Sequence, residues 1–279
     1  MKKSSLLLLI LLTTLIDQSV LAQVQNFMSY NIRYNNVNDG ENKWDERKDD
    51  VVALLNHYEP LVFGIQEGLL EQVQYIRDQS GVYDYSGVGR DDGNEKGEFT
   101  AIFYNKENLT LLTEGTFWLS ETPEKVSKDW DAALPRICSY AQFKFKDTDR
   151  TFWFFNAHFD HVGKIARANS ATLIVQKIKE IAGSVSPVIL SGDFNATPSS
   201  QPILNIISYL KDAFSNTQKA FYGPIGTFSG FDTSAKLEDR IDYIFYLNVT
   251  PKSLSHIDDR RQNGLWVSDH LPVLFQSQF

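Results

Sequence analysis

The sequence predicts an α/β protein in which two β-sheets pack face to face and helices cover their outer faces. Strand-like apolar segments outnumber helical ones, and they occur both in runs and in alternation with helices. This order favours paired sheets with outer helices, because a doubly wound parallel sheet needs more helices than the pattern contains. A single barrel is the open alternative. Aromatic residues make up 13% of the chain, which suits a large core.

Short apolar runs bounded by polar turns predict the strands. Two of these runs lie on either side of the polar loop GRDDGNEKGE. In chain order the predicted strands are residues 27–32, 61–65, 83–88, 99–104, 109–113, 116–119, 138–145, 151–157, 188–191, 241–247 and 271–275.

Apolar residues recurring at helical spacing predict four helices. The clearest of them places Ala171, Ile174, Ile178 and Ile181 on a single stripe. The predicted helices are residues 45–58, 70–78, 165–181 and 202–210, and a polar loop is expected at 35–42.

The first 22 residues have the pattern of a secretory signal peptide. Lys2 and Lys3 precede an apolar run at 6–12, and a small-residue cleavage pattern ends at Ala22. The apolar run is shorter than the ~20 residues that span a bilayer. We therefore expect residues 1–22 to be removed and 23–279 to form one monomeric domain without a transmembrane segment, secreted or periplasmic. A buried N-terminal helix is the alternative.

The net charge of −8 argues against one class of partner. A tight, non-specific nucleic-acid binder needs a basic surface, whereas a hydrolase can reverse the local charge with bound metal cations. The one cysteine, Cys138, cannot form an internal disulfide, and its strand-like surroundings predict a buried, unreactive thiol.

Several predicted strands end in an acid, an amide or an imidazole. Burying a carboxylate is unfavourable unless it is paired or binds a cation. Side chains gathered at one rim of a sheet could hold Mg²⁺ and activate water against phosphorus. The side chains at or beside these strand ends are Asn31, Glu67, His158, Asp193, Asn195, Asp242, Asp269 and His270.

Each of these residues also has an ordinary structural interpretation. Asn31 or Asp269 could form a turn, and a lone His158 could be structural. Asp160 and His161 are expected only to cap the helix that begins near Gly163. Turn formation does not explain why so many strands end in the same way, and this recurrence favours a reaction site.

Four short motifs occur in a characteristic order: QE after an apolar strand, then GDFN, RIDYIF and SDHLPV. Together they resemble the endonuclease/exonuclease/phosphatase superfamily over the chain from Asn31 to its end. WDAALPRICSY and NAHFDH look most like a bacterial subgroup of secreted or periplasmic members whose substrate is open. The resemblance implies a four-layer α/β sandwich of two mixed sheets, with the active site at one end of the paired sheets.

The resemblance also implies a set of metal ligands and phosphate contacts. Glu67 would be the principal Mg²⁺ ligand, with Asn31 beside it and Asp269 nearby. Asn195 would position the phosphate, and Asp242 would contact the phosphate or the metal region.

Acid–base roles follow from the same resemblance. Asp193 would orient the attacking water, and His270, held by Asp269, would serve in acid–base work or as a cationic clamp on the developing charge. His158 would contact a phosphate oxygen, with Glu98 fixing its ring and favouring the imidazolium. Arg136 fits a phosphate-binding position; the alternative is an ordinary strand-edge charge.

The resulting hypothesis is an exported phosphodiesterase or phosphatase that depends on Mg²⁺, with Mn²⁺ as the alternative cation. Its substrate would be a small-molecule, lipid-headgroup or nucleic-acid phosphoester, and the acidic charge favours the first two. His158 stands where the abasic-site branch uses a tyrosine, which argues against DNA repair. The alternatives are an extracellular DNA or RNA nuclease and a non-catalytic phosphoester-binding module.

Overall fold

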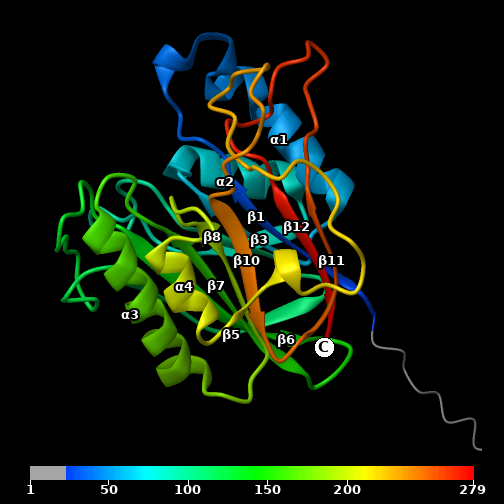
Figure 1. The fold of residues 1–279 in the computed structure, drawn as a ribbon. Helices are drawn as coiled ribbons and strands as arrows, with labels where there is room; N and C mark the ends of the chain where they lie inside the picture. The colour runs from blue at the N-terminus through cyan, green and yellow to red at the C-terminus, as the bar shows by residue number, and fades with distance from the viewer. Residues whose placement is uncertain (1–22) are drawn as a thin grey trace, which may run out of the picture.

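The computed structural model describes residues 23–279, which form two six-stranded sheets packed face to face (Figure 1). The predicted signal peptide, residues 1–22, lies outside the described residues. The first sheet has the order β11-β12-β1-β2-β4-β3 and the second has the order β5-β6-β7-β8-β10-β9. The predicted α/β architecture of paired mixed sheets is therefore confirmed.

Each sheet is mixed because it contains one parallel pair, β1–β2 or β7–β8, among antiparallel neighbours. The strands of the first sheet are β1 (Gln25–Asn31), β2 (Val62–Gln66), β3 (Tyr83–Ser86), β4 (Ile102–Asn105), β11 (Thr250–His256) and β12 (Val273–Gln278). Those of the second are β5 (Leu109–Trp118), β6 (Ile137–Phe145), β7 (Thr151–His158), β8 (Val188–Asp193), β9 (Lys211–Asp212) and β10 (Asp242–Leu247).

Each parallel pair is connected through a helix, as parallel strands require. The helix α1 (Trp44–Tyr58) joins β1 to β2, and α3 (Lys164–Ala182) joins β7 to β8. The helices α2 (Leu70–Ser80) and α4 (Gln201–Ile207) lie beside them, and Figure 1 shows one helix pair outside each sheet. Short 3₁₀ turns occupy η1 (Val37–Asn42) and η2 (Ala213–Ser215).

Three buried apolar clusters hold these four layers together. One lies between α1, α2 and the first sheet, and another between α3, α4 and the second sheet. The third fills the space between the sheets and is rich in aromatic rings, such as Phe27 and Phe152 in edge-to-face contact at 5.7 Å. Apolar burial on this scale is the main favourable term in folding.

The elements differ from the prediction at a few places. The segments predicted as two strands, 109–113 and 116–119, form the single strand β5, with a register shift between Leu111 and Thr113. The strand predicted at 99–104 begins at Ile102, and the polar loop predicted at 35–42 contains η1. The strand β11 was not predicted, because only Leu254 and His256 are buried in it.

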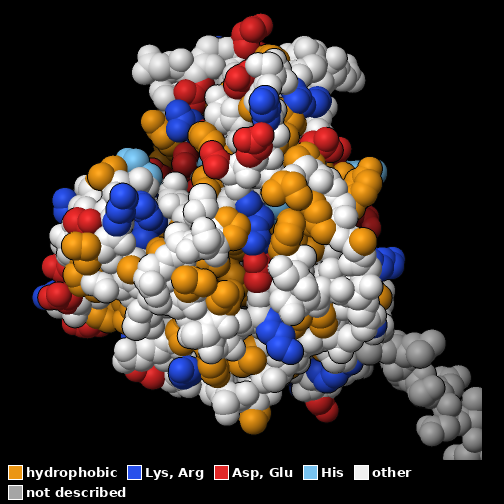
Figure 2. Space-filling model, in the orientation of Figure 1, with side chains coloured by type: hydrophobic (Ala, Val, Ile, Leu, Met, Phe, Trp, Pro, Cys, Tyr) orange, Lys and Arg blue, Asp and Glu red, His pale blue; other side chains and the backbone are white. Residues whose placement is uncertain are grey.

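The described surface carries charges of both signs. Figure 2 shows Lys and Arg side chains scattered among Asp and Glu on this face, without a continuous basic band among the residues drawn in colour. Within residues 23–279, no helix is long and apolar enough to cross a membrane.

Candidate active site

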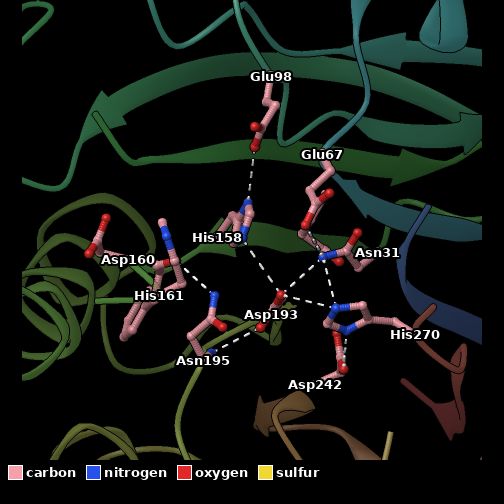
Figure 3. A network of polar contacts seen from close by, with 12 residues as sticks. Asn31, Glu67, Glu98, His158, Asp160, His161, Asp193, Asn195, Asp242 and His270 are labelled. Atoms are coloured by element: carbon pink, nitrogen blue, oxygen red, sulfur yellow. Dashed lines mark hydrogen bonds and ion pairs between the residues drawn. The ribbon is translucent and has the colours of Figure 1, made fainter. Parts of the chain in front are cut away.

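The ends of the two parallel pairs meet at one rim of the sandwich. Asn31 ends β1 and Glu67 follows β2 in the first sheet, while His158 and Asp193 end β7 and β8 in the second. Side chains from both sheets point toward one another there (Figure 3). Parallel strands place their carboxyl ends at the same edge, which explains the convergence.

Asn31 joins the two sheets through its buried carboxamide. Its Nδ2 donates to Glu67 Oε1 at 3.1 Å and to Asp193 Oδ2 at 3.0 Å, while its Oδ1 accepts from the Arg33 backbone at 3.0 Å. Glu67 has a φ of 64°, a left-handed conformation that is uncommon for a residue other than glycine. This local backbone conformation turns its carboxylate toward the rim, where strained residues are often functional.

Glu67, Asp193 and His270 form a group that fits a cation. They offer ligand atoms that all lie within 4.8 Å of one another. The two carboxylates supply the oxygen donors that Mg²⁺ and Mn²⁺ prefer. Asn31 would contribute its oxygen only after its carboxamide turned over, because the nitrogen faces both carboxylates in this structure.

His270 is held by Asp242 and not by Asp269, which corrects the expected pairing. His270 Nδ1 lies 2.9 Å from Asp242 Oδ2. The Asp269 carboxylate instead faces Arg33, whose Nε lies 3.8 Å from its Oδ2, and Ser268 Oγ lies 3.4 Å from its Oδ1. Burial alone lowers the pKa of His270, but Asp242 and Asp193 outweigh burial and raise that pKa well above its usual range.

The Asp193 carboxylate contacts four residues of the site. Its Oδ2 lies 3.0 Å from Asn31 Nδ2, 3.6 Å from His158 Nε2 and 3.8 Å from His270 Nε2. Its Oδ1 accepts from the Asn195 backbone at 2.9 Å. Burial raises the pKa of Asp193 and the nearby Asp242 carboxylate raises it further, so this carboxylate has a strong tendency to hold a proton or a cation.

Arg136 and the two histidines in contact with it, His158 and His161, face these carboxylates, and we call these three residues the cationic wall. Arg136 Nη1 lies 3.0 Å from His158 Nδ1, and its Nη2 lies 2.9 Å from His161 Nδ1. Glu98 Oε2 is 3.5 Å from His158 Nδ1 but accepts from Arg90 Nη1 at 2.5 Å. Burial and then Arg136 lower the pKa of His158 to about 3. Glu98 thus lies beside the His158 ring as expected, but the expected imidazolium is not favoured, because burial and Arg136 lower the pKa of the ring.

Asp160 and His161 do more than cap a helix. Asp160 Oδ1 accepts from the Val162 and Gly163 backbones at 3.0 and 2.7 Å, at the start of α3, while its Oδ2 lies 3.4 Å from Arg136 Nε. His161 contacts Arg136 and lines the same cavity as the other site residues. The pattern NAHFDH, with polar side chains spaced after the strand end, was the available signal.

The site lies in a cavity of about 490 Å³ that also has apolar lining. Sequence reasoning missed five of its residues, Arg33, Tyr34, Leu134, Phe228 and Ile241. The Arg33 guanidinium stacks over the Tyr34 ring at 4.5 Å and binds Asp39. The Phe228 ring packs edge-on against His270 at 4.9 Å. Arg33, Tyr34, Leu134 and Phe228 belong to loops without apolar periodicity, so the sequence offered no signal for them.

The comparisons agree with this geometry. A family model described as "Endonuclease/Exonuclease/phosphatase family" matches residues 28–270. A solved structure of an endonuclease/exonuclease/phosphatase family protein from Bacteroides thetaiotaomicron is 38% identical, with a TM-score of 0.88 over 92% of this chain and 98% of that chain.

Two further proteins are similar. A mannosyl-6-phosphatase from Bacteroides thetaiotaomicron is 38% identical, with a TM-score of 0.87 over 91% of this chain and 100% of that chain. An uncharacterized protein of Acanthamoeba polyphaga mimivirus is 28% identical over 249 residues, which are 83% of this chain and 91% of that protein.

Proposed function

The chain belongs to the endonuclease/exonuclease/phosphatase family, whose members are phosphoesterase hydrolases, and on this premise we propose that it is a divalent-metal-dependent phosphoric ester hydrolase. The observation that carries the proposal is the meeting of the Glu67 and Asp193 carboxylates, one from each sheet, beside His270, with atoms of all three residues within 4.8 Å of one another. Such a group, in which Asp193 and His270 are buried and Glu67 is partly buried, is costly to assemble for stability alone.

Glu67 and Asp193 would hold the cation, with Mg²⁺ as the first choice and Mn²⁺ as the alternative. Asn31 would join them through its carboxamide oxygen, and Asp269 stays a predicted ligand from its place beside Arg33. A bound cation would neutralise charge on a phosphoryl oxygen and so favour attack at phosphorus.

Residues of the chain itself would do the remaining work. Asp193 would accept a hydrogen bond from the attacking water, and Asn195 lies beside it to orient the phosphoryl group. His270, kept positively charged by Asp242, would stabilise the charge that develops in the transition state. Arg136 and the neutral His158 would donate to the outer phosphoryl oxygens.

For the substrate we propose a phosphomonoester of a sugar or a similar polar small molecule. The similar mannosyl-6-phosphatase supports this choice. The cavity supports it too, because Tyr34, Leu134 and Phe228 can contact the organic part of a small ester while the charged residues face the phosphate. The net charge of −8 favours a small ester over a polynucleotide, because tight binding of a polynucleotide relies on a basic surface.

We also propose that the protein acts outside the cytoplasm, which is supported by the basic and apolar pattern of residues 1–22. Expression of the full chain in a bacterial host, followed by N-terminal sequencing of the exported protein, checks this. We expect the mature protein to begin at Gln23. A product that stays in the cytoplasm with residues 1–22 intact would refute the export proposal.

The function is tested with a panel of phosphoesters, comprising sugar phosphates, nucleotides, phospholipids, duplex DNA and RNA, each assayed with Mg²⁺, Mn²⁺ or EDTA. We expect sugar phosphates to be hydrolysed fastest and EDTA to abolish turnover. Asp193→Asn and His270→Ala should each lower kcat by more than ~100-fold with unchanged folding. Faster cleavage of DNA or RNA would establish a nuclease, and tight binding without turnover would establish a binding module.

A further inference from the structure

A layer of polar side chains lies directly beneath the site, between the two sheets. It contains Gln66 from the first sheet and Asn156 and Ser191 from the second, and none of the three is exposed to solvent. Two residues further from the site, on the same faces of β7 and β8, Phe154 and Ile189 belong to the apolar core between the sheets. The interior therefore changes from apolar to polar one step before the strands end.

The Asn156 carboxamide uses its full hydrogen-bonding capacity in this layer. Its Nδ2 donates to the carbonyl oxygens of Ile65 and Ala101, in the opposite sheet, at 2.8 and 3.1 Å. Its Oδ1 accepts from Gln66 Nε2 at 2.7 Å and from Ser191 Oγ at 3.1 Å. An asparagine carboxamide has two donors and two lone pairs, so it can make no further hydrogen bond.

The close fit around Asn156 requires a glycine opposite it. A methyl group on Gly64 of β2 would overlap the Asn156 side chain and would lie 2.5 Å from Ser191 Oγ. The backbone of the first sheet at Gly64 thus lies so close to the Asn156 carboxamide of the second sheet that only glycine fits at this position. The separation of the sheets at this level is defined by polar contacts with little freedom.

These contacts are connected to the site by short lengths of strand. Gln66 directly precedes Glu67, and Ser191 lies two residues before Asp193 on the same face of β8. The register places Asn156 beside Ser191 and His158 beside Asp193. A change in the spacing of the sheets at Asn156 must therefore move Glu67 relative to Asp193.

The need to hold the two sheets together does not by itself explain why this layer is polar. A well-packed apolar layer of the same volume holds two sheets together at least as well as buried polar groups do, and the neighbouring layer is apolar. What hydrogen bonds add is a fixed distance and register, because they are directional whereas apolar contacts are not.

We propose that Asn156 is a positioning residue that fixes the separation of Glu67 and Asp193, and that it thereby sets the affinity of the site for a divalent cation. The part that concerns the cation rests on the proposed function, whereas the part that concerns the separation does not.

Three variants test this proposal. Asn156→Leu keeps the number and branching of the side-chain heavy atoms but removes every hydrogen bond of the carboxamide. Gly64→Ala keeps those groups and displaces them with one methyl group. Ser139→Ala is the matched control, because Ser139 pairs with Asn156 in register and contacts Thr100 Oγ1 at 3.0 Å in the same buried level, one strand further from Asp193.

The first measurement is the crystal structure of each variant without metal. We expect the Asn31 carboxamide to lose its contact with Glu67 or with Asp193 in Asn156→Leu and Gly64→Ala, and to keep both, at 3.1 and 3.0 Å, in the control. Retention of both contacts in the first two variants would overturn the proposal. This measurement requires no metal, so it decides the positioning role even if the native protein binds none.

The second measurement is Mn²⁺ binding, followed by electron paramagnetic resonance of the free ion well below the melting temperature. Residues that support metal ligands typically change affinity by about 10–100-fold, and we expect weakening of at least ~10-fold in Asn156→Leu and Gly64→Ala only. Equal affinity in all folded variants, with only the melting temperature lowered, would make Asn156 merely structural. Absence of Mn²⁺ binding to the native protein would count against the proposed function instead. Ser191→Ala, which removes one donor to Asn156, serves if Asn156→Leu does not fold.

Discussion

The environment of each residue of the site is set by the residues that face it across the rim. Asp193 was expected at a strand end, and there its carboxylate lies within 4 Å of Asn31, His158 and His270. Such contacts join residues far apart in the sequence, so a linear pattern can indicate the members of a site without indicating their partners. His270 shows this limit, because its neighbour in the sequence, Asp269, is not its partner.

The partner of His270 can be tested by a matched pair of variants. In Asp242→Asn, the group facing Nδ1 at 2.9 Å loses its charge, so the imidazolium loses its main support. We expect kcat to fall by at least ~100-fold and the Nδ1 proton resonance of His270 to disappear from the NMR spectrum. Asp269→Asn should keep that resonance. Its loss in Asp269→Asn alone would restore the pairing expected from the sequence.

His256, in β11, predicts a pH dependence of stability away from the site. Its Nδ1 donates to the Pro224 carbonyl at 2.8 Å, and its buried Nε2 has no hydrogen-bond partner among residues 23–279. The Phe221 ring packs 4.8 Å away. Burial lowers the pKa of His256 to about 4, and the nearby Arg240 also lowers it, while Asp212 opposes this.

The folded pKa is depressed, so the unfolded chain binds more protons between pH 6.5 and 4, and stability falls as the pH falls through this window. The loss from this group is about 2 kcal/mol between pH 7 and pH 5. We expect urea unfolding of His256→Leu to show a correspondingly flatter acid limb than the native protein. The exposed His57→Gln should leave the slope unchanged, and parallel profiles for native protein and His256→Leu would contradict the assignment.

At the scale of the elements, apolar periodicity was a reliable guide wherever an element is buried on a face. The helix predicted at 165–181 is α3, Lys164–Ala182, because its apolar stripe packs against the second sheet. The strand β11 was missed because it lies at the edge of its sheet with few buried residues. Pattern reasoning detects burial, so it cannot detect an element held mainly by backbone hydrogen bonds.

Loops were the least predictable elements, and they carry part of the site. Asp131, in the loop before Arg136, accepts from the Ile165 and Ala166 backbones at 3.2 and 2.7 Å and so ties this loop to the start of α3. Asp160 ties the same loop from the other side, through the Leu134 backbone at 3.2 Å. These contacts hold the cationic wall in place, yet nothing in the spacing of the loop residues indicates them.

The two sheets of the molecule contain the same structural unit. In each, a helix connects two parallel strands that end at the shared rim, so the site forms only when the sheets face each other. The QE and GDFN motifs end β2 and β8, one in each sheet. The ordered motifs could therefore predict the two halves, while their separation is set by side chains such as Asn156 in the space between the sheets.

Because the two sheets bring two carboxylates close together at the rim, we expect a bound cation to stabilise the folded protein. Without one, Glu67 and Asp193 approach each other across the rim, bridged by the Asn31 amide and with His270 3.8 Å from Asp193. A ligand at 100 times its Kd stabilises the folded state by about 2.7 kcal/mol, which for a domain of this size raises Tm by about 5–10 °C. We expect calorimetry to show this rise with Mg²⁺, relative to NaCl of equal ionic strength.

Glu67→Gln is the decisive comparison in the same experiment. It keeps the shape of the side chain and an acceptor for the Asn31 amide, but it removes a charge that attracts the cation. We expect its Tm in EDTA to match or exceed that of the native protein, because one of the crowded carboxylates is gone, and its response to Mg²⁺ to require at least ~10-fold more ion. An equal response in both proteins would place the cation elsewhere, and the rim would then lose its role as a metal centre.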